Sequence, residues 1–314
     1  MKNKVEYQAR STCELRQGLI FDDCKDYWHK LVHLKDYESS LGEFDVIFCS
    51  RCNLGFTDPH PTEETCGYLY DTKDSSDFDI ISNSIIDRLK DYLSIRLLKR
   101  LAPHRHVRKV LDYSTGNGRF AASAVKAFPN ACVDAVDYQS SPPPLLKDQS
   151  KSGVRYYNLI QLTEQHSQYD LIILRHVLEH TYHPIKLLKD LSERLAPNGQ
   201  IYIEVPNLDS GCAKVFGKYW KGYYVPRHLF HYTMPSLAEI INQAGMEAEV
   251  GRNEMPSMGN TISILTGINQ SNIFIQLLGV VFHPIQLLIE TFYRSSTCIN
   301  AKCRLTQVKQ HQTN

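Results

Sequence analysis

The sequence predicts an α/β fold, a mostly parallel Rossmann-like sheet with helices on both faces. Short apolar runs that end in turns alternate along the chain with stretches of helical periodicity, as in βαβ units. A glycine turn, Gly116-Asn117-Gly118, joins one such run to a helical stretch. The composition, 42% hydrophobic and 22% charged, is that of an ordinary globular protein. These observations exclude a disordered or fibrous chain.

The expected elements follow one another in a regular order. The first is an amphipathic helix, in which apolar residues recur at helical spacing from Ile85 to Leu101. The core then alternates as strand Lys109–Asp112, helix Arg119–Phe128, strands Ala131–Asp137 and Tyr169–Leu174, helix Pro184–Leu195 with its first-turn proline, and strand Gln200–Val205. After a looser stretch, we expect a helix over Pro235–Ala244 that Gly245 ends, and a strand over Met246–Val250.

The 314 residues, 36.0 kDa, allow two domains or one domain with extensions. We expect an irregular cysteine-bearing region over 1–65 that is a candidate for zinc binding, and a helical lead-in over 66–105. The Rossmann-like core then covers 106–206, and 207–314 completes the sheet and adds an apolar helical segment.

Charge and cysteine content bear on partners and location. The 35 Lys and Arg nearly balance the 34 Asp and Glu, so no nucleic-acid partner is expected. The first residues are charged and lack the apolar stretch of a secretory signal. The nine cysteines form no even framework of the secreted kind. We therefore expect a cytoplasmic protein, with membrane association as an open addition.

The expectation of membrane association rests on an uncharged segment near the C-terminus. From Met255 to Ile289 there is no Asp, Glu, Lys or Arg, and the apolar runs Ile273–Val281 and Ile285–Ile289 are separated by Phe282-His283-Pro284. A membrane-spanning helix needs roughly twenty uninterrupted apolar residues. The sequence favours a helix buried on the sheet or packed against a partner. Peripheral membrane contact through 273–289, as an interfacial or re-entrant hairpin, is the alternative.

Two acids accompany the glycine turn. Asp112 ends the strand before the turn, and Asp137 ends the next strand, nineteen residues after Gly118. Glycines let the backbone approach a ligand closely, and the amide groups at the start of the following helix are free to bind it. A carboxylate at the spacing of Asp137 suits the hydroxyls of a ribose.

With these residues the chain resembles class I S-adenosylmethionine-dependent methyltransferases. In that family an acid and G-x-G-x-G follow the first strand; here Ser114 replaces the first glycine. The segments Tyr169–His180 and Leu195–Asn207 continue the resemblance, and Pro226-Arg227-His228-Leu229-Phe230-His231 matches a subgroup with a P-R-H-x-x-H element and an N-terminal cysteine region. The resemblance implies S-adenosylmethionine as cofactor, held by Asp112, Tyr113, Ser114, Gly116, Gly118, Asp137, Tyr138 and Arg175.

The implied reaction is methyl transfer to a small-molecule or lipid-linked acceptor. A hydroxyl or carbon acceptor needs a base, and ligands bind at the carboxyl ends of the strands in open α/β folds. The candidates there are His176, Glu179, His180, His228 and His231. The first three also match H-x-x-E-H, a zinc-peptidase signature, but they follow a buried strand rather than lying on one helix. A divalent-metal site is retained as an alternative. Some methyltransferases build such a site from E-x-x-E-H, and here His176 stands in place of the first Glu.

The cysteine region offers an incomplete metal set. Cys49-Ser50-Arg51-Cys52 has the spacing of a zinc knuckle. In the resembling subgroup a second C-x-x-C stands upstream; Cys13 fits its first position, but Arg16 occupies the second. The fourth ligand is left open among Cys24, His29 and His33. A decayed site that folds without metal is the alternative to structural zinc.

Two other functions remain. Gly116-x-Gly118-x-x-Ala121 also fits the dinucleotide fingerprint of an NAD-dependent oxidoreductase, although Asp112 would then place a carboxylate near a pyrophosphate. The second alternative is a degenerate methyltransferase fold that serves as a binding or assembly module. It is kept because Ser114 and the incomplete cysteine set depart from the family pattern.

Overall fold

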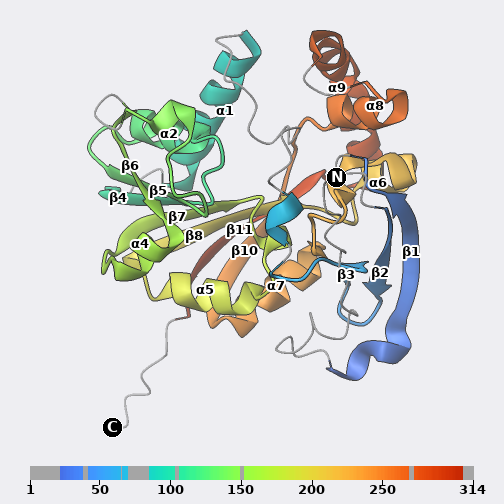
Figure 1. Cartoon of the computed structure of the whole chain (residues 1–314), viewed down its shortest axis with the longest axis horizontal. Coiled ribbons are helices and arrows are strands. Elements are labelled where there is room, and N and C mark those ends of the chain that lie inside the picture. The colour runs from blue at the N-terminus through green and yellow to red at the C-terminus, as the bar shows by residue number, and fades with distance from the viewer. Residues whose placement is uncertain are drawn as a thin grey trace, which may run out of the picture.

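The centre of the molecule is a seven-stranded sheet in the order β10-β11-β8-β7-β4-β5-β6 (Figure 1). The computed structural model describes residues 22–37, 42–64, 66–69, 85–102, 106–148, 152–268 and 272–306. The strands of this sheet are β4 (Lys109–Tyr113), β5 (Cys132–Asp137), β6 (Val154–Asn158), β7 (Tyr169–Arg175), β8 (Leu195–Pro206), β10 (Met246–Asn253) and β11 (Cys298–Leu305).

The sheet is parallel except for β11, which runs antiparallel to both β8 and β10. The chain winds outward from β4 through β5 to β6, then crosses to β7 on the other side of β4. The direction of winding therefore reverses between β4 and β7. Ligands bind at such a reversal, outside the carboxyl ends of the strands, in open α/β sheets.

Helices cover both faces of this sheet. Successive residues of β7 point to opposite faces: Leu171 and Ile173 pack with one core cluster, Ile172 and Leu174 with the other. The first face is covered by α1 (Ile85–Leu101) and α2 (Arg119–Ala127), the second by α4 (Leu159–Glu164), α5 (Pro184–Ser192) and α7 (Met234–Gln243). The predicted fold class, α/β with helices on both faces of a mostly parallel sheet, is confirmed.

A second sheet corrects the expectation that 1–65 is irregular. Strands β1 (Trp28–Lys35), β2 (Glu43–Cys49), β3 (Leu54–Asp58) and β9 (Phe230–His231) pair antiparallel in that order, after a 3-10 turn η2 (Asp22–Tyr27). Phe44 and Val46 are buried on either side of the partly exposed Asp45. This period-two pattern is the sequence signal of a half-buried strand.

The remaining elements connect the two sheets or extend from them. Short 3-10 turns are η3 (Cys66–Leu69), η5 (Pro144–Leu146), η6 (Leu178–His180), η7 (Gly217–Tyr219) and η8 (Lys221–Tyr223). Helix α6 (Gly211–Phe216) packs against α9 (Ile273–Tyr293), which also packs against α8 (Met258–Thr266). In Figure 1, α8 and α9 stand at the upper edge of the molecule, away from the central sheet.

Helix α9 differs from its expectation in two respects. It is continuous over 21 residues and includes Pro284, where the sequence analysis placed a break between two runs. Burial on the sheet, one of the two expected packings, is wrong, because only 17% of its most apolar window is buried within this chain; packing against a partner stays a prediction. By length and composition α9 is the one helix among the described residues that could cross a membrane.

Other differences concern bounds and elements that were not expected. Helix α5 ends at Ser192, and β8 begins at Leu195 rather than at Gln200, with an irregular register opposite Tyr169 and Leu171. Strand β11 was not expected, nor were β6 and α4. β11 follows α9 directly and lies between β8 and β10, so its place depends on contacts distant in sequence.

Candidate active site

The glycine turn between β4 and α2 places several polar groups at the carboxyl end of β4. The Thr115 hydroxyl donates to Asp112 Oδ2 at 2.7 Å, and the Thr115 amide donates to the Val136 carbonyl on the neighbouring strand. Gly116 and Gly118 have φ of 56° and 80°, the left-handed region that favours glycine. A Cβ at Gly118 would collide with Leu146, whereas one at Gly116 would meet none of the described residues within 4 Å. Gly116 is therefore the point where a ligand can approach the backbone.

Asp137 fixes this turn from the end of β5. Its Oδ2 accepts the Gly116 amide at 2.8 Å, and its Oδ1 accepts the Tyr138 amide at 2.8 Å. A carboxylate has about four acceptor positions, so these two bonds leave capacity for hydroxyl donors. Burial raises the pKa of Asp137 above its usual value, while the amide bonds lower it. The side chain of Tyr138 beside it is half exposed.

Other predicted cofactor residues lie around this turn. Ser114 adopts φ of 58°, the conformation that a glycine takes without strain. Burial raises the pKa of Asp112 to about 6, although its bond from Thr115 acts in the opposite direction. Arg175, at the end of β7, donates to Glu204 Oε1 from Nε at 3.0 Å and from Nη2 at 2.8 Å. Its guanidinium also lies 4.5 Å from the ring centre of Phe120 on α2.

The residues that were predicted to face the methyl acceptor also lie close together in space. We call His176, Glu179, His180, His228 and His231 the imidazole cluster. His176 Nδ1 lies 3.2 Å from Glu179 Oε1, and His228 Nε2 lies 3.9 Å from the same oxygen. Ligand atoms of Glu179, His180 and His228 all lie within 4.8 Å of one another. The structure thus joins the turn after β7 to a segment some fifty residues later in the chain.

Carbonyl groups set the proton positions on two of these rings. His180 Nδ1 lies 3.0 Å from the Arg227 carbonyl, and His228 Nδ1 lies 2.9 Å from the Gly222 carbonyl. A carbonyl only accepts, so each Nδ1 carries a proton. Burial, together with the neighbouring His180 and His231, holds the pKa of His228 well below its usual value. His228 is therefore neutral near pH 7 and presents a basic nitrogen towards Glu179.

His176 has the opposite charge state. Burial alone would lower its pKa, but hydrogen bonds with Glu179 and Glu204 raise the pKa to about 9. Its Nε2 lies 3.1 Å from Met255 Sδ and 3.6 Å from Glu204 Oε1. As an imidazolium near pH 7, His176 cannot accept a proton. Its φ of 53° is left-handed, and such strain in a non-glycine residue is characteristic of functional sites.

His231 connects the cluster to the smaller sheet. The Thr57 hydroxyl donates to the His228 carbonyl at 2.6 Å and lies 3.0 Å from His231 Nε2. Because the hydroxyl proton is used in the first bond, His231 Nε2–H donates to Thr57. Burial lowers the pKa of His231 to about 3, which keeps it neutral. Its place in the site is to position the loop that carries His228.

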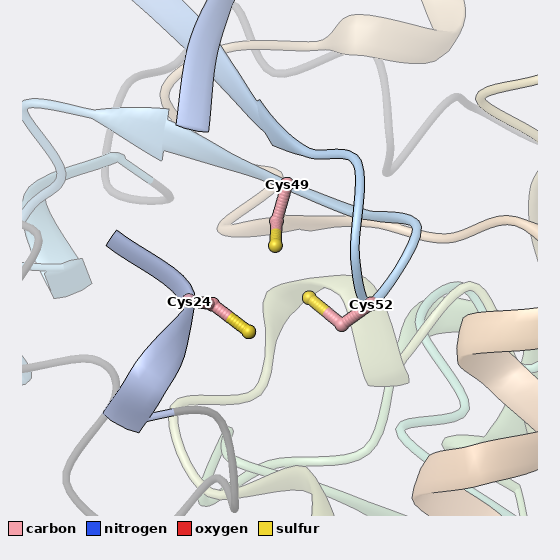
Figure 2. A group of neighbouring side chains, drawn as sticks. All are labelled: Cys24, Cys49 and Cys52. Carbon is pink, nitrogen blue, oxygen red and sulfur yellow. The ribbon is translucent and has the colours of Figure 1, made fainter. Parts of the chain in front are cut away.

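The cysteine residues form a separate group beside β2. The thiol sulfurs of Cys24, Cys49 and Cys52 lie within 4.8 Å of one another and point towards a common centre (Figure 2). Cys13, the other predicted ligand, lies outside the described residues. His33 lies 2.6 Å from Asp45 and 3.1 Å from Glu43, and the His29 ring packs on Phe48, which leaves Cys24 as the third member of the group.

The comparison with protein families gives this site its context. The sequence model of a methyltransferase domain, Methyltransf_23, matches residues 86–249, slightly more than half of the chain. The chain belongs to this methyltransferase family. Membership in this family agrees with the order of the strands around β4. It also argues against the alternative that the glycine turn belongs to an NAD-dependent oxidoreductase. A comparison with curated proteins finds no match.

Solved methyltransferase structures resemble this methyltransferase at low sequence identity. Coclaurine N-methyltransferase bound to N-methylheliamine and S-adenosylhomocysteine is 14% identical, with a TM-score of 0.48 over 77% of this chain and 82% of that one. The plantazolicin methyltransferase in complex with S-adenosylhomocysteine is 15% identical, with a TM-score of 0.45 over 78% and 90%. A Burkholderia thailandensis 1,6-didemethyltoxoflavin-N1-methyltransferase, with that substrate and S-adenosylhomocysteine bound, is 18% identical, with a TM-score of 0.43 over 70% and 81%.

Residues outside the predicted set also build this site. Glu204 is fully buried and contacts Arg175, His176 and Tyr202. A glutamate inside the apolar run Gln200–Val205 was a usable signal, since a buried charge requires partners. Met255 and Thr57 have no such signal, because nothing local distinguishes them.

Proposed function

We propose that this protein transfers a methyl group from S-adenosylmethionine to a small-molecule or lipid-linked acceptor. The observation that carries the proposal is the edge of the sheet where Asp112, the open Gly116 turn and Asp137 meet in a chain of the methyltransferase family. S-adenosylmethionine supplies the methyl group when it is bound. Asp137 would hold its ribose, and the amides of the glycine turn would face its polar part.

We further propose that the imidazole cluster faces the acceptor. A hydroxyl or carbon acceptor must lose a proton as the methyl group arrives. His228, neutral with its proton on Nδ1, keeps an Nε2 lone pair 3.9 Å from Glu179 Oε1, so it can take that proton. His176, charged and paired with Glu179 and Glu204, would hold the carboxylates in place rather than act as the base.

Calorimetric titration with S-adenosylmethionine, S-adenosylhomocysteine and NAD tests the proposed cofactor site. We expect the two adenosyl ligands to bind and NAD not to bind. A folded protein that binds neither adenosyl ligand would contradict the proposal. Binding without turnover on any acceptor in a broad screen would favour the alternative, a degenerate fold that serves as a binding or assembly module.

A metal-assisted variant of this site is a second candidate. Two imidazole nitrogens and one carboxylate within 4.8 Å suit zinc, manganese or iron better than magnesium, which prefers oxygen ligands. A bound cation would lower the pKa of an acceptor hydroxyl there. Elemental analysis of the purified protein tests it: His228→Gln should lose the metal while His183→Gln, an exposed histidine outside the cluster, retains it.

We propose structural zinc for the cysteine group, in keeping with the subgroup that the N-terminal region resembles. Tetrahedral zinc–thiolate bonds of about 2.3 Å place sulfurs about 3.8 Å apart, which the separations below 4.8 Å allow after small rotations. Elemental analysis should find zinc that Cys52→Ser loses. Cys132→Ser, a cysteine on β5, is the matched control. Absence of zinc from the unaltered, folded protein would favour a decayed site that folds without metal.

A further inference from the structure

Helix α9 presents a wide apolar face that no described element covers. Its exposed apolar residues recur three or four positions apart, which places them on one face: Phe274, Leu277, Val281, Ile285, Leu288 and Phe292. Val281, Leu288 and Phe292 have exposed fractions of 67%, 68% and 81%. No charged residue occurs between Met255 and Ile289, so the loop and helix α8 that precede α9 are uncharged as well.

The C-terminal part of α9 is fixed to the body of the protein. Glu290 is buried and accepts the amides of Gly211 and Cys212 at the start of α6. Gln286, also buried, accepts the Ser257 amide and donates to the Met255 carbonyl. The part from Ile273 to Ile285 extends beyond these anchors. At about 1.5 Å per residue it measures about 20 Å, less than the roughly 30 Å of a hydrocarbon core.

Helix α8 pairs closely with this projecting part. Gly259 and Gly279 face each other at the crossing; a Cβ on Gly279 would lie 2.8 Å from the Gly259 Cα. Glycine at this crossing lets two backbones approach without side chains between them, the packing that helices in lipid use. The two helices therefore form an uncharged hairpin with a rigid crossing.

Basic residues surround the base of this hairpin. Helix α8 packs on η7, which carries the exposed Lys218, and Arg294 follows the last residue of α9. Lys214, on α6, lies 5.6 Å from the ring centre of Tyr293. An apolar hairpin with cations at its base matches a bilayer surface, whose acyl region lies below anionic head groups.

We propose that the α8–α9 hairpin docks this protein on a lipid bilayer by inserting into one leaflet. A leaflet is about 15 Å of hydrocarbon, close to the depth that the projecting part can reach. The surfaces of non-obligate protein complexes are a weaker match, because as a whole they are only about as apolar as the rest of a protein surface. The anchors at Gln286 and Glu290 keep the domain outside the membrane.

Docking would bring the candidate site close to the lipid surface. The Met255 backbone is bonded to Gln286 of α9, and the Met255 side chain contacts His176 of the imidazole cluster. A lipid-linked acceptor would then reach the cluster from the bilayer. This last step rests on the proposed function, whereas docking itself does not.

Vesicle flotation with the full-length protein tests the docking. The vesicles are phosphatidylcholine alone, or phosphatidylcholine and phosphatidylglycerol in equal amounts. We expect the protein to float with both, and a variant with Leu277→Asp, Val281→Asp and Leu288→Asp to bind at least about tenfold less. The control has three exposed apolar residues replaced elsewhere, Leu89→Asp, Ile160→Asp and Leu305→Asp, and should float as the unaltered protein does. Lys218→Glu should weaken binding to the anionic vesicles alone.

A second readout measures insertion. In Val281→Trp, brominated acyl chains should quench the new tryptophan, while the two native tryptophans, Trp28 on β1 and Trp220, which is 2% exposed, are unaffected. The docking proposal is overturned if the unaltered protein floats with neither vesicle, if the triple α9 variant floats equally well, or if that variant only converts a dimer of this chain into a monomer. Titration with S-adenosylhomocysteine in the same preparations tests the proposed cofactor site independently of flotation. Failure of docking and failure of the proposed function can therefore be told apart.

Discussion

The glycine turn and the imidazole cluster both follow strands of the central sheet, yet they are built in different ways. The turn lies within 112–118 and is completed by one acid, Asp137, and its geometry depends on backbone amides and left-handed residues. The cluster is assembled from distant segments, and its geometry depends on buried side chains that fix one another's charge and protonation. Substitutions should therefore disturb the turn at only a few positions, whereas the geometry of the cluster should be sensitive to substitution at many.

Replacing the acid that completes the turn should have the largest effect on cofactor affinity. Asp137→Asn removes the charge and one acceptor that hydroxyl donors would use, so we expect affinity for S-adenosylhomocysteine to fall at least about 50-fold. Asp209→Asn, an exposed acid near α6, should leave affinity unchanged. Calorimetric titration measures both. Equal affinity in the Asp137 variant would mean that the cofactor does not depend on this edge.

A change in the cluster should affect turnover and leave cofactor affinity alone. Glu179→Gln removes the carboxylate that faces His180 and His228, and general acid–base groups contribute about 100-fold or more to rate. We expect kcat to fall by about that factor, with S-adenosylhomocysteine binding within about twofold of the unaltered protein. His183→Gln is the exposed control. A parallel loss of cofactor affinity would show that the two regions are not independent.

The cluster should also make stability depend on pH. The pKa of His176 is raised from 6.5 to about 9 in the folded protein, so its stabilisation is complete below pH 6.5 and is lost as pH rises through 9. We expect the free energy of unfolding to fall by about 3 kcal/mol across this interval. Urea unfolding at several pH values measures it. His176→Gln should flatten the slope; an unchanged slope would assign it to other groups.

Relief of strain in the turn should give the smallest effect. Ser114 holds φ of 58°, so Ser114→Gly should raise the free energy of unfolding by about 0.5 to 1 kcal/mol. Ser140→Gly, at a position without positive φ, should instead lower it slightly. Thermal unfolding compares the two variants. Destabilisation by Ser114→Gly would show that the serine side chain contributes contacts that outweigh its strain.

The sequence by itself determined much of the central sheet and the cofactor edge. Apolar runs and helical periodicity predicted β4, β5, β7 and β8 with their helices, because each signal lies within one element. The glycine turn and its acids were identifiable for the same reason. The candidates for the imidazole cluster were named from the resemblance and from the expected edge of the sheet, without knowledge of which would touch.

Only the tertiary structure decided the rest. The charge of His176 depends on Glu204 of the neighbouring strand β8 as well as on the nearby Glu179, and the Nδ1 protons of His180 and His228 depend on carbonyls of the loop at 222–227. Strand β11 and the exposure of α9 likewise depend on what packs beside them. Local pattern determines which elements form and which faces are apolar; burial, protonation and an uncovered face depend on contacts between segments far apart in the chain.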